Sequence, residues 1–174
     1  MNKVEVLKLL SDFIAIQSVS ADSKRQSETL KAVGFLKSKL IELGFDVKLM
    51  KKDNFPPLII GTYHIDADRY QYGNKKTIGI YGHYDIQPED PVNEWKTPPF
   101  KLTVRNGKMY GRGVADNKGH VIQNLTSIKR LIEVNKLKNN IVFILEGEEE
   151  VGSENFDEEI FWKGLGALNK IYSP

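Results

Sequence analysis

Three short segments contain the residue types that could perform chemistry: residues 82–85, 111–119 and 146–153. The first contains a histidine and an aspartate, the second an aspartate among glycines, and the third four glutamates. Histidine and carboxylate side chains are the ligands of a zinc site that has no cysteine, and this sequence contains none. Each segment alone is a weak signal, because such a histidine is usually structural and an acidic run often begins a helix. Together, the three segments predict a metal site.

The spacing within these segments supports a metal ion. His83 and Asp85 are two residues apart, which suits a carboxylate that orients an imidazole ligand and raises its basicity. The four glutamates follow an apolar stretch and would repel one another unless cations or protons compensated them. A divalent ion is the natural compensator, and one carboxylate left free of it could act as a base.

Two other functions explain less of the sequence. A glycosidase could use two of the glutamates as acid and base, but His83, Asp85 and Asp116 would then have no role. A nucleic-acid site would need clustered basic residues, whereas the net charge is +2 and the lysines and arginines are scattered. The glycine-rich stretch is neither a Walker motif nor a dinucleotide fingerprint. We therefore expect no nucleic-acid partner.

The elements that must position these residues predict an α/β fold in a single domain. Apolar residues recur at helical spacing over residues 2–16, 24–43 and 120–135. Apolar or alternating stretches predict strands over residues 45–51, 58–63, 77–82 and 141–145. Asn106-Gly107 predicts a β-hairpin, and four prolines within residues 87–99 indicate an extended loop.

We expect a mixed, mainly parallel sheet flanked by helices, in which the 77–82 strand is buried. The first and third charged segments directly follow the strands that end near Gly82 and Leu145. Ligands of open α/β sheets lie beyond the carboxyl ends of the strands, so these segments should meet at one edge.

The composition of the chain indicates where in the cell we expect the protein. Hydrophobic residues make up 40% of the chain, which is enough for a core. No apolar stretch approaches the ~18 residues that span a bilayer, and the N-terminus lacks the apolar region of a signal peptide. With no cysteine for disulfides, we expect a cytoplasmic protein without a membrane partner.

The combined motifs resemble the co-catalytic zinc metallopeptidases, which include aminoacylase, glutamate carboxypeptidase and the carnosinase-type dipeptidases. The matching positions are residues 82–88, Trp95, 99–100, 106–108, 110–113, Asp116, 118–119 and 146–153. This resemblance implies a zinc peptidase catalytic domain that acts on a small peptide or an N-acyl amino acid. Two Zn²⁺ ions are implied, and the same ligand types also accept Mn²⁺ or Co²⁺.

The resemblance implies roles for five residues. His83 would bind one metal ion, Glu150 would bind the second, and Asp116 would bridge both. Glu149 would be the general base that takes a proton from the attacking water, and Asp85 would orient His83. The reaction would be metal-dependent hydrolysis of the amide bond of a dipeptide or an N-acyl amino acid.

The resemblance also implies that residues 1–174 are a partial catalytic domain. Members of the family continue with the C-terminal half of that domain, a lid domain for dimerisation, and two further metal ligands. Two zinc ions need about five protein ligands, and the motifs supply three. His64 and His120 are interpreted as structural. The alternative to an enzyme is therefore an incomplete fragment with at most a weak metal site and no activity alone.

The tail of the chain shows no clear continuation of the family pattern after about Asp157. This loss favours a premature stop or a frameshift near residues 157–161. A sheet cut short would leave an exposed edge, so we also expect self-association.

Overall fold

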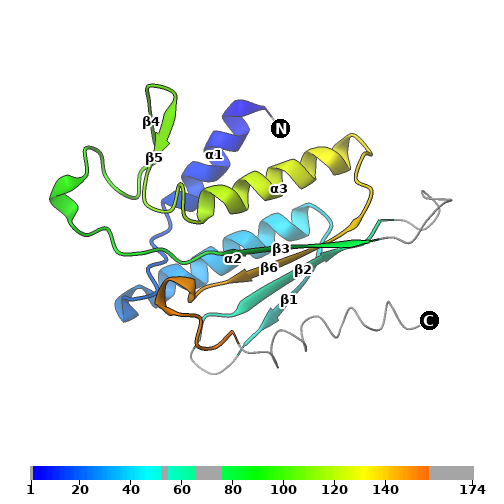
Figure 1. Ribbon diagram of the computed structural model, residues 1–174, viewed down its shortest axis with the longest axis horizontal. Helices are drawn as coiled ribbons and strands as arrows, with labels where there is room; N and C mark the ends of the chain where they lie inside the picture. Colours follow the sequence, from blue (N-terminus) through cyan, green and yellow to red (C-terminus); the bar gives the residue numbers. More distant parts are fainter. Residues whose placement is uncertain (1, 52–54, 66–75, 157–174) are drawn as a thin grey trace.

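The computed structural model describes residues 2–51, 55–65 and 76–156, and confirms the α/β class (Figure 1). The helices are α1 (Lys3–Ile14), α2 (Gln26–Glu42) and α3 (Lys118–Glu133), with short 3-10 turns η1 (Ser23–Arg25), η3 (Val92–Glu94) and η4 (Glu149–Val151). The strands are β1 (Asp46–Met50), β2 (Leu58–Tyr63), β3 (Thr77–His83), β4 (Thr103–Arg105), β5 (Lys108–Tyr110) and β6 (Asn140–Glu146). None of the helices described is long and apolar enough to cross a membrane.

Four of the strands form one sheet in the order β1-β2-β6-β3. The sheet is mixed, as expected, but it is not mainly parallel in the part of the chain described. The β1–β2 and β2–β6 pairs are antiparallel, and β3–β6 is parallel. The physical reason lies in the connections, because a parallel pair needs a long crossover, which α3 provides between β3 and β6.

The expectation that the 77–82 strand is buried is wrong for most of its length. Strand β3 pairs only with β6 among the described strands and forms an edge of the sheet. Ile78 is 44% exposed and Tyr81 is 53% exposed. Strand β6 lies between β2 and β3 and is buried throughout. Burial of β3 begins only at Gly82 and His83, where it enters the charged region.

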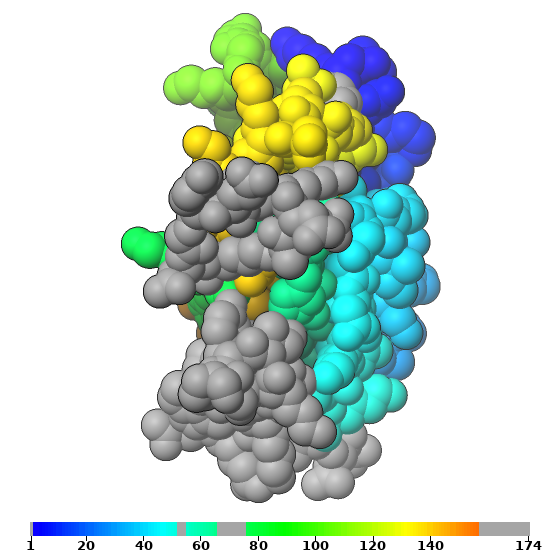
Figure 2. All heavy atoms as spheres, turned by 90° about the vertical axis from the view of Figure 1, so that its right-hand side faces the viewer, coloured from blue at the N-terminus to red at the C-terminus, as the bar shows by residue number. Residues whose placement is uncertain are grey.

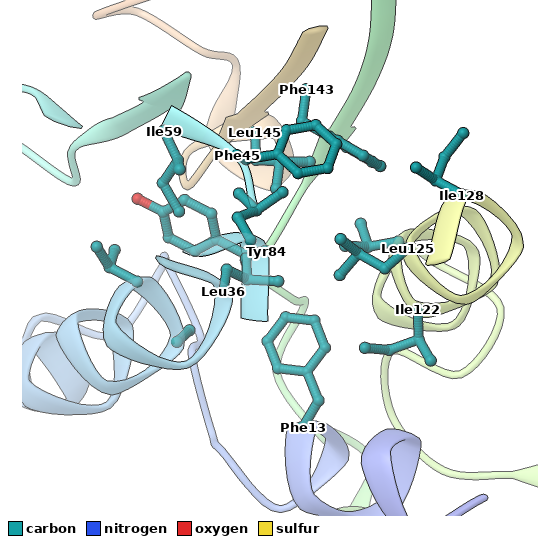
Figure 3. Close-up of a cluster of buried hydrophobic side chains, with 14 of the residues drawn as sticks. Phe13, Leu36, Phe45, Ile59, Tyr84, Ile122, Leu125, Ile128, Phe143 and Leu145 are labelled. Atoms are coloured by element: carbon teal, nitrogen blue, oxygen red, sulfur yellow. The ribbon is translucent and has the colours of Figure 1, made fainter. Parts of the chain in front are cut away.

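The helices pack against one face of the sheet and enclose the main core (Figure 3). Phe13 of α1, Leu36 of α2 and Leu125 of α3 converge there with Phe143 and Leu145 of β6. In Figure 2 the end of α3 and the loop after it (yellow) lie beside α1 (blue), which α3 contacts. The alternate residues of the strands form a second buried cluster on the opposite face: Leu58, Ile60, Val142 and Ile144.

Local sequence signals explain where several elements begin and turn. Asn2 caps α1: its side chain accepts a hydrogen bond from the N–H of Glu5, and the Glu5 carboxylate accepts one from the N–H of Asn2. The predicted hairpin is confirmed as β4–β5. Its turn residues have positive φ angles, 50° at Asn106 and 73° at Gly107, which match the twist of a two-residue hairpin.

Candidate metal centre

The parallel pairing of β3 with β6 brings two of the charged segments together. His83 ends β3, Glu146 ends β6, and the two residues are partners in the register. The segments that follow each strand therefore leave the sheet side by side, as expected for its carboxyl edge. The third segment leads into α3, and Asp116 lies two residues before the first residue of that helix.

A close contact between β3 and the start of α3 places Asp116 beside His83. A Cβ atom at Gly82 would lie 2.8 Å from the Oδ1 atom of Asn117 and 3.2 Å from Val121, so glycine permits this approach. The backbone N–H of His83 donates a hydrogen bond to Asn117 Oδ1 at 3.3 Å. His83 Nε2 then lies 3.0 Å from Asp116 Oδ1.

His83, Asp116 and Glu150 converge on one point. Each offers a ligand atom, and these atoms all lie within 4.8 Å of one another. His83 is buried, whereas the Asp116 side chain is 73% exposed, so the group is walled by protein on one side and open to solvent on the other. One imidazole and two carboxylates at an open position are the donor set of a catalytic zinc site. The residues therefore fit a divalent ion.

Asp85 supports two members of this group from behind. Its side chain is fully buried, and Oδ1 lies 3.2 Å from His83 Nδ1. Its other oxygen, Oδ2, accepts a hydrogen bond from the backbone N–H of Glu150 at 3.1 Å. A carboxylate on Nδ1 fixes the tautomer of the imidazole and leaves Nε2 free to face the group.

Glu149 lies beside the group without joining it. Its Oε2 is 3.8 Å from His83 Nε2, and its side chain is 43% exposed. Gln87 also takes part, because its Nε2 donates hydrogen bonds to Glu150 Oε2 at 2.8 Å and to Glu150 O at 3.1 Å. Sequence reasoning gave Gln87 no role, since a surface amide after a strand carries no chemical signal until its partner is known.

The four glutamates of 146–150 do not form one cluster. Glu146 Oε1 accepts a hydrogen bond from the Tyr81 hydroxyl at 2.5 Å, and Glu148 accepts one from Asn155 at 3.1 Å. Burial raises the pKa of the Glu148 carboxyl, and the charge of Glu146 raises it further. Mutual repulsion is therefore relieved partly by separate neutral donors, and Glu150 is the glutamate in the metal-type group.

His83 supplies positive charge in the site. Burial opposes its charged form, but hydrogen bonds to Asp85 and Asp116 outweigh this and raise the pKa of His83 to about 9. Without a metal ion, a proton on the imidazole therefore compensates the surrounding carboxylates at neutral pH.

Neither of the other histidines belongs to this group. His120 lies in the first turn of α3 and faces a cavity between α1, α3 and the β4–β5 hairpin. His64, just after β2, is not in any group of three or more metal-type side chains among the described residues. Two metal ions are implied by the resemblance, and within the described part of the chain one three-ligand group is formed.

Comparison with known proteins identifies the family. Residues 79–171, more than half of the chain, match the model of "Peptidase family M20/M25/M40". This match continues to residue 171, so the expected loss of resemblance after Asp157 is wrong. That loss was the reason for inferring a stop or a frameshift near residues 157–161, and the inference no longer has this support. Residues 157–174 lie outside the described part of the structure.

Several similar proteins are dipeptidases by name. A Cys-Gly metallodipeptidase of Schizosaccharomyces pombe is 35% identical over 171 residues, which cover 91% of this chain and 34% of that protein. A Beta-Ala-His dipeptidase of Mus musculus is 31% identical over 172 residues, with shares of 91% and 34%.

Solved structures agree with this result. The di-peptidase Dug1p of Saccharomyces cerevisiae has a TM-score of 0.83 at 30% identity. The match covers 96% of this chain and 36% of the Dug1p chain. Human carnosine dipeptidase 1 has a TM-score of 0.80 at 31% identity, with shares of 90% and 34%. The chain therefore spans about a third of the length of these relatives. The family match and these structures establish that this chain belongs to peptidase family M20/M25/M40.

Proposed function

We propose that this chain provides metal-binding and proton-transferring residues for hydrolysis of the amide bond of a dipeptide or an N-acyl amino acid. The observation that carries the proposal is the convergence of His83, Asp116 and Glu150 within 4.8 Å. Relatives that are 31–35% identical and are named as dipeptidases for Cys-Gly and Beta-Ala-His support a small peptide substrate.

Each side chain of the site has a role in this proposal. His83, Asp116 and Glu150 would hold the ion, for which we propose Zn²⁺, with Mn²⁺ and Co²⁺ as alternatives for the same ligand types. When bound, the ion supplies Lewis-acid polarisation of the substrate carbonyl and lowers the pKa of water. Glu149, outside the ligand set and half exposed, takes the proton of the attacking water and passes it to the leaving amine. Asp85 keeps His83 Nε2 directed at the site.

A second candidate is a metal-binding fragment that is inactive alone. The described residues bring together three protein ligands, whereas two ions that share one ligand need about five. The chain also spans about a third of its relatives, which supports our proposal that residues 1–174 provide part of the catalytic domain. We further propose a cytoplasmic location, supported by the absence of cysteine.

Calorimetric titration of the purified chain with Zn²⁺ tests the metal site. We expect saturable binding by the wild type, loss of that binding in His83→Ala, and little change in the control His120→Ala. Equal binding by wild type and His83→Ala would overturn the site.

Turnover separates the two candidates. The chain is assayed on Cys-Gly and on β-alanyl-histidine with Zn²⁺ or Mn²⁺, beside the Glu149→Gln variant. Hydrolysis that disappears in Glu149→Gln, while metal binding remains, supports the enzyme. Metal binding without turnover in the wild type supports the inactive fragment.

A further inference from the structure

The last turn of α1 and the segment after it, residues 13–19, contact two of the three segments that carry the proposed metal ligands: the one that bears Asp116 and the one that follows His83. One contact is made by Lys118, whose side chain is 0% exposed. Its Nζ donates hydrogen bonds to the backbone oxygens of Phe13, at 3.2 Å, and Ile16, at 2.5 Å. The ammonium group also lies 4.8 Å from the centroid of the Phe13 ring. Lys118 is two residues after Asp116, so this contact fixes the Asp116 loop.

The other contact is made by Ser18, which is also 0% exposed. Its hydroxyl donates a hydrogen bond to the backbone oxygen of Tyr84 at 2.6 Å, and its own carbonyl accepts one from the N–H of Ile86 at 3.0 Å. Tyr84 and Ile86 flank Asp85, so Ser18 fixes the loop that supports His83. An isolated parallel bridge between Val19 and Ile86 continues this pairing.

Gly113 allows the two loops to pack together over this segment. A Cβ atom at Gly113 would lie 2.9 Å from the Ile86 side chain and 3.3 Å from that of Lys118. The φ angle of 85° at Gly113 is also one that residues with a side chain rarely adopt. The Asp116 loop, the Asp85 loop and residues 13–19 therefore meet in one closely packed junction.

Burial of the Lys118 ammonium needs an explanation, because removing a charge from water is costly unless it is paired and hydrogen-bonded. The backbone oxygens of Phe13, in the last turn of α1, and of Ile16, two residues after the helix, offer partial negative charge to the ammonium. They compensate the ammonium in part, and only while Lys118 stays in this one position. A lysine in this position is therefore held tightly, and so is the loop that bears Asp116.

We propose that residues 13–19 are a clamp that sets the distance between His83 and Asp116, and that Lys118 and Ser18 are positioning residues for the metal site. This inference rests on the proposed function, because the site it positions is the proposed metal site. Neither residue belongs to the proposed ligand group. Ser18 acts through backbone atoms that flank Asp85, and Lys118 acts through the short stretch of backbone that joins it to Asp116.

Titration with Co²⁺, followed by visible absorption, tests the clamp in the full chain. We expect Lys118→Met and Ser18→Ala each to weaken Co²⁺ binding about tenfold and to change the absorption bands of the bound ion. The control is Val33→Ala, which removes a core contact in α2 and lowers stability without removing any hydrogen bond of the clamp. It should leave the affinity and the bands of the folded protein unchanged.

A measurement without metal separates failure of the clamp from failure of the proposed function. The ring proton signals of His83 in the metal-free protein are assigned with His83→Ala and compared between variants. We expect them to move in Ser18→Ala and Lys118→Met and to stay in place in Val33→Ala. If the wild type binds no Co²⁺, the proposed function is overturned. The His83 ring proton signals then still show whether residues 13–19 position His83.

Unchanged His83 signals in Ser18→Ala would overturn the clamp, as would Co²⁺ affinities equal to that of the wild type. Lys118→Met removes a buried group with several contacts, so this variant could fail to fold. Ser18→Ala removes only one hydroxyl group. If Lys118→Met does not fold, the Ser18→Ala variant alone tests the clamp.

Discussion

The carboxylate of Asp85 lies 3.2 Å from His83 Nδ1, with both side chains buried at the end of β3. The same carboxylate accepts the backbone N–H of Glu150 at 3.1 Å. Asp85 therefore joins the ends of β3 and β6 and orients two of the three residues of the proposed metal site.

Replacing Asp85 with asparagine should weaken metal binding. The amide keeps the size of the side chain but removes the negative charge that supports His83, so we expect Zn²⁺ affinity to fall about 10- to 100-fold. Calorimetric titration measures this change. Asp12→Asn is the matched control, because Asp12 is an exposed carboxylate on α1 that pairs with Lys8. An affinity equal to that of the wild type would show that Asp85 does not support His83.

The pH dependence of stability should show two opposing contributions in metal-free protein. The folded-state pKa of His83, about 9, lies above its ordinary 6.5, so its stabilising contribution is complete below pH 6.5 and is lost by pH 9. Burial lowers the pKa of Lys118 from 10.5 to about 7, so its destabilising contribution is complete below pH 7 and is relieved towards pH 10.5. Between pH 7 and 9 the two opposing changes in the free energy of unfolding largely cancel.

Variants separate these contributions. In His83→Gln, the free energy of unfolding should rise with pH above 7, by up to about 1.4 kcal/mol per pH unit. In Lys118→Met, it should fall between pH 6.5 and 9 by a similar slope. Urea unfolding with a chelator present measures both. The same pH profile in the two variants would contradict these assignments.

Loss of the Tyr81 hydroxyl should destabilise the fold. It donates a hydrogen bond to the buried Glu146 carboxylate, whose other oxygen, Oε2, is buried without a partner among the described residues. Tyr81→Phe would leave that carboxylate without its donor, and we expect the free energy of unfolding to fall by about 1–3 kcal/mol. Tyr110→Phe, at an exposed tyrosine of β5, should change it little. Urea unfolding at pH 7 would contradict this expectation if the two variants were equally stable.

Strand β3 offers a route to self-association. It forms an edge of the described sheet and exposes Ile78 and Tyr81, and edge strands of this kind pair with other chains. We expect light scattering to detect assemblies larger than a monomer, and Ile78→Lys to reduce them. Val4→Lys, at an exposed residue of α1, is the control and should leave the distribution unchanged. A monodisperse wild-type monomer would contradict this expectation.

The sequence alone was sufficient for features that depend on neighbouring residues in the chain. The strand expected over 58–63 is β2 with the same limits, and Asn106-Gly107 forms the predicted hairpin. Helix periodicity located α1, α2 and α3 to within a few residues. The residue types of the three charged segments also indicated a metal site, because the chemistry of a ligand is a property of the side chain itself. The choice of His83, Asp116 and Glu150 as ligands came from the resemblance to the peptidase family, and the structure brings these three together.

Only the tertiary structure decided features that depend on which elements are neighbours. An apolar strand such as β3 reads the same in sequence at an edge or at the centre of a sheet, and the antiparallel β2–β6 pair joins strands far apart in the chain. Burial of Lys118 and the link from Asp85 to Glu150 were also not visible in the sequence. A lysine and a carboxylate acquire these roles only when folding supplies their partners from distant segments and removes the water around them.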